Sequence, residues 1–157
     1  MAEHGEDKAM AEQQLRKILY VEDEPDIQVV ARLALENLGG FTVKVCSSGK
    51  EALEEGPSFD PDLILMDVMM PELDGPSTFL AMREIASLQN KPAVFMTAKV
   101  QPQEIAEYKR IGAVAVISKP FDPTTLADEI RDIWQKSFLQ KGDRRSPWRW
   151  CTEKTGS

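Results

Sequence analysis

Four short apolar segments of this chain each end abruptly in polar residues, and this pattern limits the folds that the sequence can adopt. The clearest is Leu63-Ile64-Leu65-Met66, which runs directly into Asp67 and then into a loop with Pro71 and Asp74-Gly75. Short apolar runs bounded by turn residues are typical of strands buried on both faces of a parallel sheet. The other three segments are residues 18–21 before Glu22-Asp23, 93–96 before Thr97, and 114–117 before Ser118-Lys119-Pro120.

Helical signals separate these strands. Pro25 suits the first position of a helix, where its missing N–H costs nothing, and apolar residues recur at helical spacing as far as Gly39-Gly40. The other predicted elements are a strand over 41–46, a short helix that opens with the capping box 48–51 and ends before Gly56-Pro57, helices over 76–88 and 102–110, and a last helix capped by Asp122-Pro123. Five such strand–helix units predict an α/β fold with a parallel sheet covered on both faces.

The polar strand ends predict a metal site. Ligands of such sheets bind beyond the carboxyl ends of the strands, where Glu22, Asp23 and Asp67 bring up to three negative charges and Lys119 offsets one. Two like charges about 4 Å apart repel by about 4 kcal/mol at an effective dielectric constant near 20. Either some of these groups take up protons or a cation is recruited. Oxygen ligands without His or Cys favour Mg²⁺ (or Mn²⁺) over zinc.

With a metal bound, Asp67 is a candidate oxygen nucleophile towards a phosphoryl group. Phosphoryl transfer depends mostly on positioning and charge neutralisation. The Thr97 hydroxyl and the Lys119 ammonium are candidates to hold the peripheral phosphoryl oxygens. The product would be an acyl phosphate, which is prone to hydrolysis and suits a temporary signal.

Over about residues 16–139 the chain resembles a response-regulator receiver domain of two-component signalling. The resemblance rests on four motifs in the family's order, which are Leu19-Tyr20-Val21-Glu22-Asp23-Glu24, Met66-Asp67-Val68-Met69-Met70-Pro71 with Asp74-Gly75, Met96-Thr97-Ala98, and Ser118-Lys119-Pro120-Phe121. It implies a flavodoxin-like (βα)5 fold, a doubly wound parallel five-stranded sheet with strand order 2-1-3-4-5.

The resemblance also implies a role for each motif residue. Asp67 would accept a phosphoryl group, with Glu22, Asp23, Asp67 and the backbone carbonyl of Met69 as metal ligands. Thr97 would be the switch hydroxyl and Lys119 the phosphoryl clamp, with the Lys119-Pro120 peptide bond in the cis form. The protein would then catalyse only its own phosphorylation and dephosphorylation, signal through a conformational switch, and act on no separate substrate.

Two positions depart from the family pattern. Many receivers have Asp where this chain has Glu22, which keeps the charge but lengthens its reach. Val116 stands where the family usually has a Tyr or Phe ring that swings inward on activation. Because valine has no ring, displacement of the loop of residues 97–99 and of the helix over 102–110 is the switching route that stays open.

Partners follow from the same resemblance. The only histidine is His4, so a phosphohistidine donor must be another protein, either a sensor histidine kinase or a histidine phosphotransfer protein. A protein target would bind the face made by the helix over 102–110, the fifth strand and the last helix, with Tyr108 as an exposed contact.

Three alternative functions stay open. A phosphatase with an aspartyl-phosphate intermediate would need a second acid where Met69 stands. A flavin-binding relative of the fold would need a phosphate-binding loop after the first strand, where this chain is acidic. A receiver-like protein-interaction module would work without phosphorylation.

Composition narrows the cellular setting. A net charge of −7 argues against a nucleic-acid-binding surface, and two cysteines are too few for a disulfide framework. The polar N-terminus lacks the apolar core of a signal peptide, and no apolar stretch reaches the roughly 20 residues of a membrane span. These features predict a cytoplasmic protein with a flexible leader over 1–15, a receiver domain over 16–139 and a flexible tail over 140–157. That tail is too short for a helix-turn-helix output domain.

Overall fold

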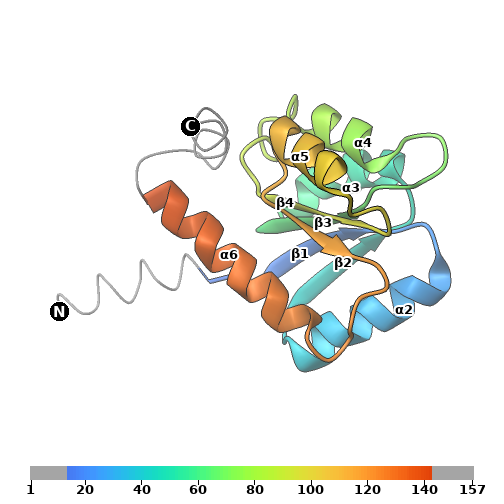
Figure 1. The fold of residues 1–157 in the computed structure, drawn as a ribbon, viewed down its shortest axis with the longest axis vertical. Helices are drawn as coiled ribbons and strands as arrows, with labels where there is room; N and C mark the ends of the chain where they lie inside the picture. The colour runs from blue at the N-terminus through green and yellow to red at the C-terminus, as the bar shows by residue number, and fades with distance from the viewer. Residues whose placement is uncertain (1–13, 143–157) are drawn as a thin grey trace.

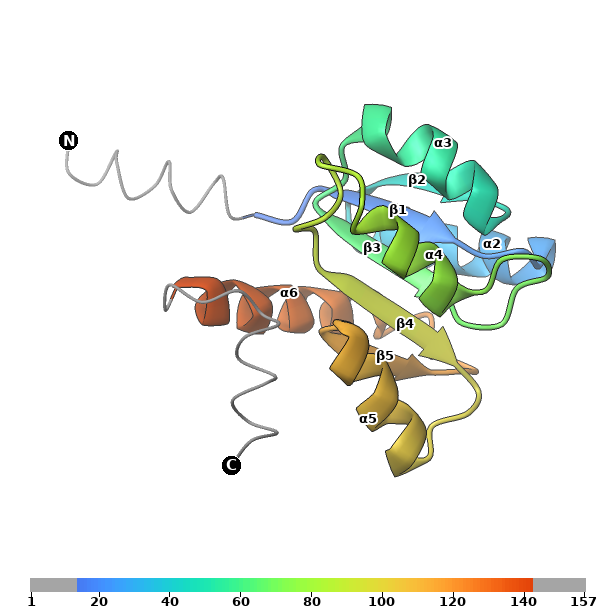
Figure 2. The same ribbon diagram turned by 90° about the horizontal axis from the view of Figure 1, so that it is seen from above.

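The predicted strands form one parallel sheet in the order β2-β1-β3-β4-β5 (Figure 1), so the expected doubly wound fold and strand order are confirmed. The computed structural model of the chain describes residues 14–142. The strands are β1 (Lys17–Val21), β2 (Thr42–Cys46), β3 (Leu63–Asp67), β4 (Ala93–Thr97) and β5 (Ala115–Ser118). Figure 2 shows the arrowheads of β1, β4 and β5 pointing to the same side of the molecule.

The sheet reverses its winding at β1 and β3, and this reversal places the site. β1 pairs with β2 on one side and with β3 on the other, while the chain continues outward through β4 and β5. The register sets Val21 beside Met66, so Glu22 and Asp67, the next residues, leave the sheet side by side. Crevices at such reversal points are the usual ligand sites of open α/β sheets.

Helices cover both faces of the sheet (Figure 1). On one face lie α2 (Pro25–Leu33), its π-helical continuation η1 (Ala34–Leu38) and α6 (Leu126–Gly142). On the other lie α3 (Gly49–Phe59), α4 (Gly75–Met82) and α5 (Pro102–Ile111). Each face buries its own apolar cluster against the sheet, and the side chains of β1, β3 and β4 alternate between the two clusters. This double burial explains why those three strands are almost entirely apolar.

The prediction that the helix opening with the capping box 48–51 ends before Gly56-Pro57 is wrong, because α3 continues to Phe59. Gly56 is buried against β1, and a Cβ there would lie 3.1 Å from the Leu19 side chain. Its glycine therefore serves close packing of helix on strand and does not end the helix. The helix ends at Asp60, whose left-handed backbone (φ 55°) turns the chain towards β3.

The helix predicted over 76–88 is also shorter than its apolar pattern suggests. α4 ends at Met82, and a series of turns follows. Leu88 remains buried in those turns, while the Arg83 guanidinium donates a hydrogen bond to the Ile111 carbonyl (2.8 Å). The apolar residues thus reach the core without a continuous helix.

The last helix, α6, begins at Leu126. It follows a turn in which the Asp122 carboxylate accepts a hydrogen bond from the Thr124 amide.

The chain ends lie largely outside the described residues. The predicted flexible leader (1–15) is described only at residues 14 and 15, and His4 is not part of the described range. Of the predicted tail (140–157), residues 140–142 belong to the end of α6. No helix within residues 14–142 is long and apolar enough to cross a membrane.

We expect the aromatic cluster on the sheet face covered by α3, α4 and α5 to contribute strongly to the free energy of unfolding. The Phe95 ring is fully buried and meets Phe79 and Tyr108 edge to face, at centroid distances of 5.7 and 5.5 Å. Phe95→Ala should lower the free energy of unfolding by about 3–5 kcal/mol, measured by urea denaturation. Leu80→Ala, at a half-exposed position on α4, should cost less than about 1 kcal/mol. Equal losses in the two variants would contradict this assignment of the core.

Candidate functional site

Three carboxylates meet at the carboxyl end of the sheet. Glu22, Asp23 and Asp67 each offer an oxygen, and these oxygens lie within 4.8 Å of one another. Glu22 and Asp67 are buried, while Asp23 is partly exposed. The structure therefore brings together the acidic residues that the sequence predicts as metal ligands. An all-oxygen donor set of this kind fits Mg²⁺ or Mn²⁺.

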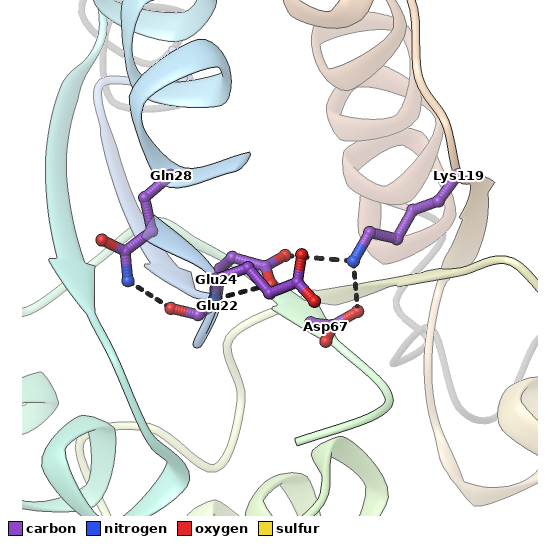
Figure 3. A network of polar contacts seen from close by, with 5 residues as sticks. All are labelled: Glu22, Glu24, Gln28, Asp67 and Lys119. Carbon is purple, nitrogen blue, oxygen red and sulfur yellow. Dashed lines mark hydrogen bonds and ion pairs between the residues drawn. The ribbon is translucent and has the colours of Figure 1, made fainter. Parts of the chain in front are cut away.

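Lys119 bridges the two buried carboxylates (Figure 3). Its ammonium donates hydrogen bonds to Asp67 Oδ1 (2.9 Å) and Glu22 Oε1 (3.2 Å), and its side chain is only 16% exposed. The Lys119-Pro120 peptide bond is cis, as the resemblance implied. One positive charge thus serves two buried negative charges, with a third carboxylate close by.

Burial and the neighbouring charges together shift the pKa values of Glu22, Asp67 and Lys119. Burial raises the pKa of Glu22, the nearby Asp67 charge raises it further, and Lys119 only partly offsets both effects. Burial also raises the pKa of Asp67, against the hydrogen bond and charge of Lys119. Burial disfavours the Lys119 ammonium, but its hydrogen bonds and ion pairs with Asp67 and Glu22 prevail and raise its pKa. A bound cation would relieve the excess negative charge.

Thr97 ends β4 beside this cluster and is fully buried. Its Oγ1 accepts a hydrogen bond from the Lys99 amide (3.0 Å), and its carbonyl accepts the Lys119 amide (2.9 Å). The hydroxyl therefore engages the start of the β4–α5 loop. Through its backbone, Thr97 also fixes the point at which Lys119 leaves β5.

The loop after β3 is shaped by Asp74-Gly75. The Asp74 carboxylate caps α4 by accepting the Ser77 amide (2.8 Å), and the Gly75 amide donates to the Val68 carbonyl (2.9 Å). A Cβ at Gly75 would lie 2.5 Å from the Asp67 carbonyl oxygen, so only glycine permits this approach. Met69 lies in the same loop with a 61% exposed side chain, and its backbone carbonyl as a metal ligand stays a prediction.

Comparison with known proteins identifies the family. Residues 18–131 match the family model described as "Response regulator receiver domain". The chain belongs to this family. Among curated relatives, the response regulator Rre1 of Synechocystis sp. is 34% identical over 116 residues, which cover 74% of this chain and 50% of that protein. The transcriptional regulatory protein PhoP of Bacillus subtilis is 33% identical over 124 residues, with 79% and 50% covered. The receiver chain therefore spans about half the length of these relatives.

Solved structures agree with the family assignment. The receiver resembles the chemotaxis response regulator CheY4 of Vibrio cholerae with a TM-score of 0.71 and 28% identity, covering 76% of this chain and 99% of that one. It also resembles the signal receiver domain of a histidine kinase from Syntrophus aciditrophicus, with a TM-score of 0.67, 28% identity, and 77% and 91% covered.

Two polar residues beneath and beside the receiver site were missed by sequence analysis. The fully buried Tyr20 hydroxyl has no hydrogen-bond partner among residues 14–142, and burial together with the Glu22 and Asp67 charges raises its pKa. Gln28, on α2, donates to the backbone carbonyl of Glu22 (Figure 3). A phenol in an otherwise apolar strand was the available signal for Tyr20. A lone glutamine on a helix gave none.

Tyr108 is less exposed than expected, and its role as a contact for a target stays a prediction. Tyr108 is only partly exposed, and its ring packs against Phe95 in the core beneath α5. Val116 lies on β5 opposite Phe95 and is itself partly buried. The rings that contact Phe95 on β4 come from Phe79 on α4 and Tyr108 on α5.

Burial of Asp67 predicts a pH-dependent loss of stability in the metal-free protein. The pKa of Asp67 is higher in the folded state than in the unfolded state. The folded state therefore loses stability as pH rises above the unfolded-state pKa of about 4. Asp67→Asn removes this titration. We expect the free energy of unfolding of wild type, relative to Asp67→Asn, to fall as pH rises above the ordinary pKa of an aspartate carboxyl, in urea titrations with EDTA.

Glu107→Gln is a control of opposite sign. The hydrogen bond from Arg110 and its charge lower the pKa of the exposed Glu107 carboxyl. Wild type should therefore gain slightly in stability over Glu107→Gln as pH rises through the ordinary carboxyl range. A difference between wild type and Asp67→Asn that also rises with pH would contradict the burial argument.

Proposed function

We propose that Asp67 is the phosphoacceptor of this receiver and takes its phosphoryl group from a phosphohistidine on another protein. One Asp67 carboxylate oxygen attacks phosphorus, so an O–P bond forms as the P–N bond to the histidine breaks. The histidine leaves with the bonding electron pair. The observation that supports this role is the meeting of Asp67, Glu22, Asp23 and Lys119 where the sheet winding reverses.

The proposed metal ligands are Glu22, Asp23, Asp67 and the Met69 carbonyl. When bound, Mg²⁺ or Mn²⁺ would neutralise charge on the oxygens of the transferring phosphoryl group. The protein's part is to hold its carboxylates within 4.8 Å of one another despite their repulsion. Lys119 performs this task through its two hydrogen bonds, and it doubles as the proposed clamp on a phosphoryl oxygen.

Thr97 is the proposed switch hydroxyl. To donate a hydrogen bond to a phosphoryl group on Asp67, its Oγ1 must turn from the Lys99 amide that it now accepts. The β4–α5 loop would lose that contact and move with α5. Because Val116 offers no ring, this loop movement is the proposed route from phosphorylation to the target face of α5, β5 and α6.

The proposed partners are a sensor histidine kinase or a histidine phosphotransfer protein as donor, and a protein target on the α5–β5–α6 face. We propose a cytoplasmic location and no activity on separate substrates. Three properties support this set: the family assignment, the acidic site, and a net charge of −7, which disfavours direct nucleic-acid binding.

Phosphorylation of Asp67 is directly testable. Incubation with a small phosphodonor, such as acetyl phosphate, and Mg²⁺ should add one phosphoryl group to wild type, and EDTA should abolish the reaction. Asp67→Asn should show no labelling because an amide oxygen is a poor nucleophile. Intact-protein mass spectrometry measures the product, and loss of the label in hydroxylamine identifies an acyl phosphate.

Asp60→Asn is the matched control, since Asp60 pairs with Lys91 at an exposed position. It should be labelled as wild type is. Full labelling of Asp67→Asn would reject Asp67 as the acceptor.

The switch role of Thr97 makes a separate prediction. Thr97→Ala should still be phosphorylated, because Asp67 and Lys119 are unchanged, but the phosphorylation-dependent NMR shifts of α5 amides should largely disappear. Thr125→Ala removes an exposed hydroxyl before α6 and should leave those shifts intact. Wild-type shifts in Thr97→Ala would contradict the role of its hydroxyl.

A further inference from the structure

The loop after β1 carries two of the proposed metal ligands, Glu22 and Asp23, and most of its hydrogen bonds are made by Glu22. The Glu22 amide donates to the Cys46 carbonyl (3.0 Å), Oε1 accepts Lys119, and Oε2 accepts the Glu24 amide (3.2 Å). Its carbonyl accepts the Gln28 side-chain amide (Figure 3). Every polar group of this buried residue therefore has a partner.

Asp23 has no such support. Its carboxylate makes no hydrogen bond or ion pair with another residue in the described part of the chain. The next residue, Glu24, is the N-cap of α2 and makes no side-chain capping bond. Asp23 can be held in place only through its backbone. The nearest restraint is the peptide group that joins it to Glu22.

Gln28 supplies that restraint. Since a peptide group is planar, the carbonyl of Glu22 and the amide of Asp23 turn as one unit. The bond from Gln28 Nε2 to the Glu22 carbonyl fixes the plane of that unit. It thereby limits the directions in which the Asp23 side chain can leave the loop.

Gln28 is itself anchored from a second element. The same amide group donates to Ser47 Oγ (3.1 Å), and the Ser47 backbone amide donates to Glu51 Oε1 (2.8 Å). Glu51 belongs to the capping box of α3, whose Ser48 Oγ accepts the Glu51 amide (3.0 Å). The loop after β1 is therefore braced against the start of α3 as well as against α2.

We propose that Gln28 is a positioning residue for the divalent-cation site, which orients the Asp23 carboxylate through the Glu22–Asp23 peptide. This inference rests on the proposed function of the acidic cluster as a Mg²⁺ site. Gln28 would then contribute to the affinity for the cation without contacting the cation or the phosphoryl group.

The test compares wild type with Gln28→Met, which keeps the side-chain length but removes both donors. Isothermal titration calorimetry should show a Mg²⁺ Kd weakened roughly three- to tenfold, the range expected for one hydrogen bond. In the metal-free protein, the Asp23 and Glu24 amides should exchange faster with solvent. Gln103→Met removes an exposed glutamine contact on α5 (to Gln101, 2.9 Å) and should match wild type in both measurements.

A kinetic measurement separates positioning from general damage. With acetyl phosphate as donor, Gln28→Met should need more Mg²⁺ for half-maximal phosphorylation, while its rate at saturating Mg²⁺ returns close to that of wild type. A lower rate at saturation with an unchanged half-saturation point would overturn the proposal.

The outcomes distinguish the two hypotheses. If wild type binds Mg²⁺ and Gln28→Met binds it with the same Kd, the positioning role is rejected and the proposed function stands. If wild type itself fails to bind Mg²⁺, the proposed function fails, and the inference fails with it.

Discussion

Two buried carboxylates share a single ammonium at the carboxyl end of the sheet, and the organisation of the site depends on this contact. Glu22 and Asp67 would repel each other strongly in a buried setting without Lys119, whose hydrogen bonds reach both. The pairing holds the acids close but leaves an excess of negative charge once Asp23 is counted. Lys119 therefore offsets enough of the repulsion for the protein to fold, and the remaining negative charge still favours binding of a divalent cation.

Much of this arrangement was predictable from sequence, because it follows from strand periodicity. Apolar runs that end in Glu22, Asp67, Thr97 and Lys119 place those residues at one edge of a parallel sheet, and the structure brings them there. The helix ends were less predictable. Gly56 reads as a stop but allows close packing on Leu19, and the apolar pattern up to Leu88 continues in turns after α4 has ended. In both cases tertiary contacts override a local signal.

Contacts made by single polar side chains were the least predictable. The bond from Gln28 to the Glu22 carbonyl depends on the angle at which α2 leaves the sheet, and no periodicity encodes that angle. The placement of Tyr108 failed for a related reason. A tyrosine on a weakly amphipathic helix is predicted to be exposed. In the structure its ring packs against Phe95, which also contacts Phe79. Since Phe95 and Thr97 are on the same strand and face, this ring contact also joins α5 to the strand that ends in the proposed switch hydroxyl.

Lys119 lies 97 residues after Glu22 and 52 after Asp67 along the chain, and this separation has a consequence for synthesis on the ribosome. β1 and β3 are synthesised together with the acids at their ends, Glu22 and Asp67, before the lysine that pairs with both has been made. Until β5 docks, the nascent sheet holds two acids with no basic partner from the last strand, and closing the core around them is electrostatically unfavourable. Docking of β5 therefore completes the sheet and, in the same step, brings Lys119 to the two acids, so that the fold and the site are completed together.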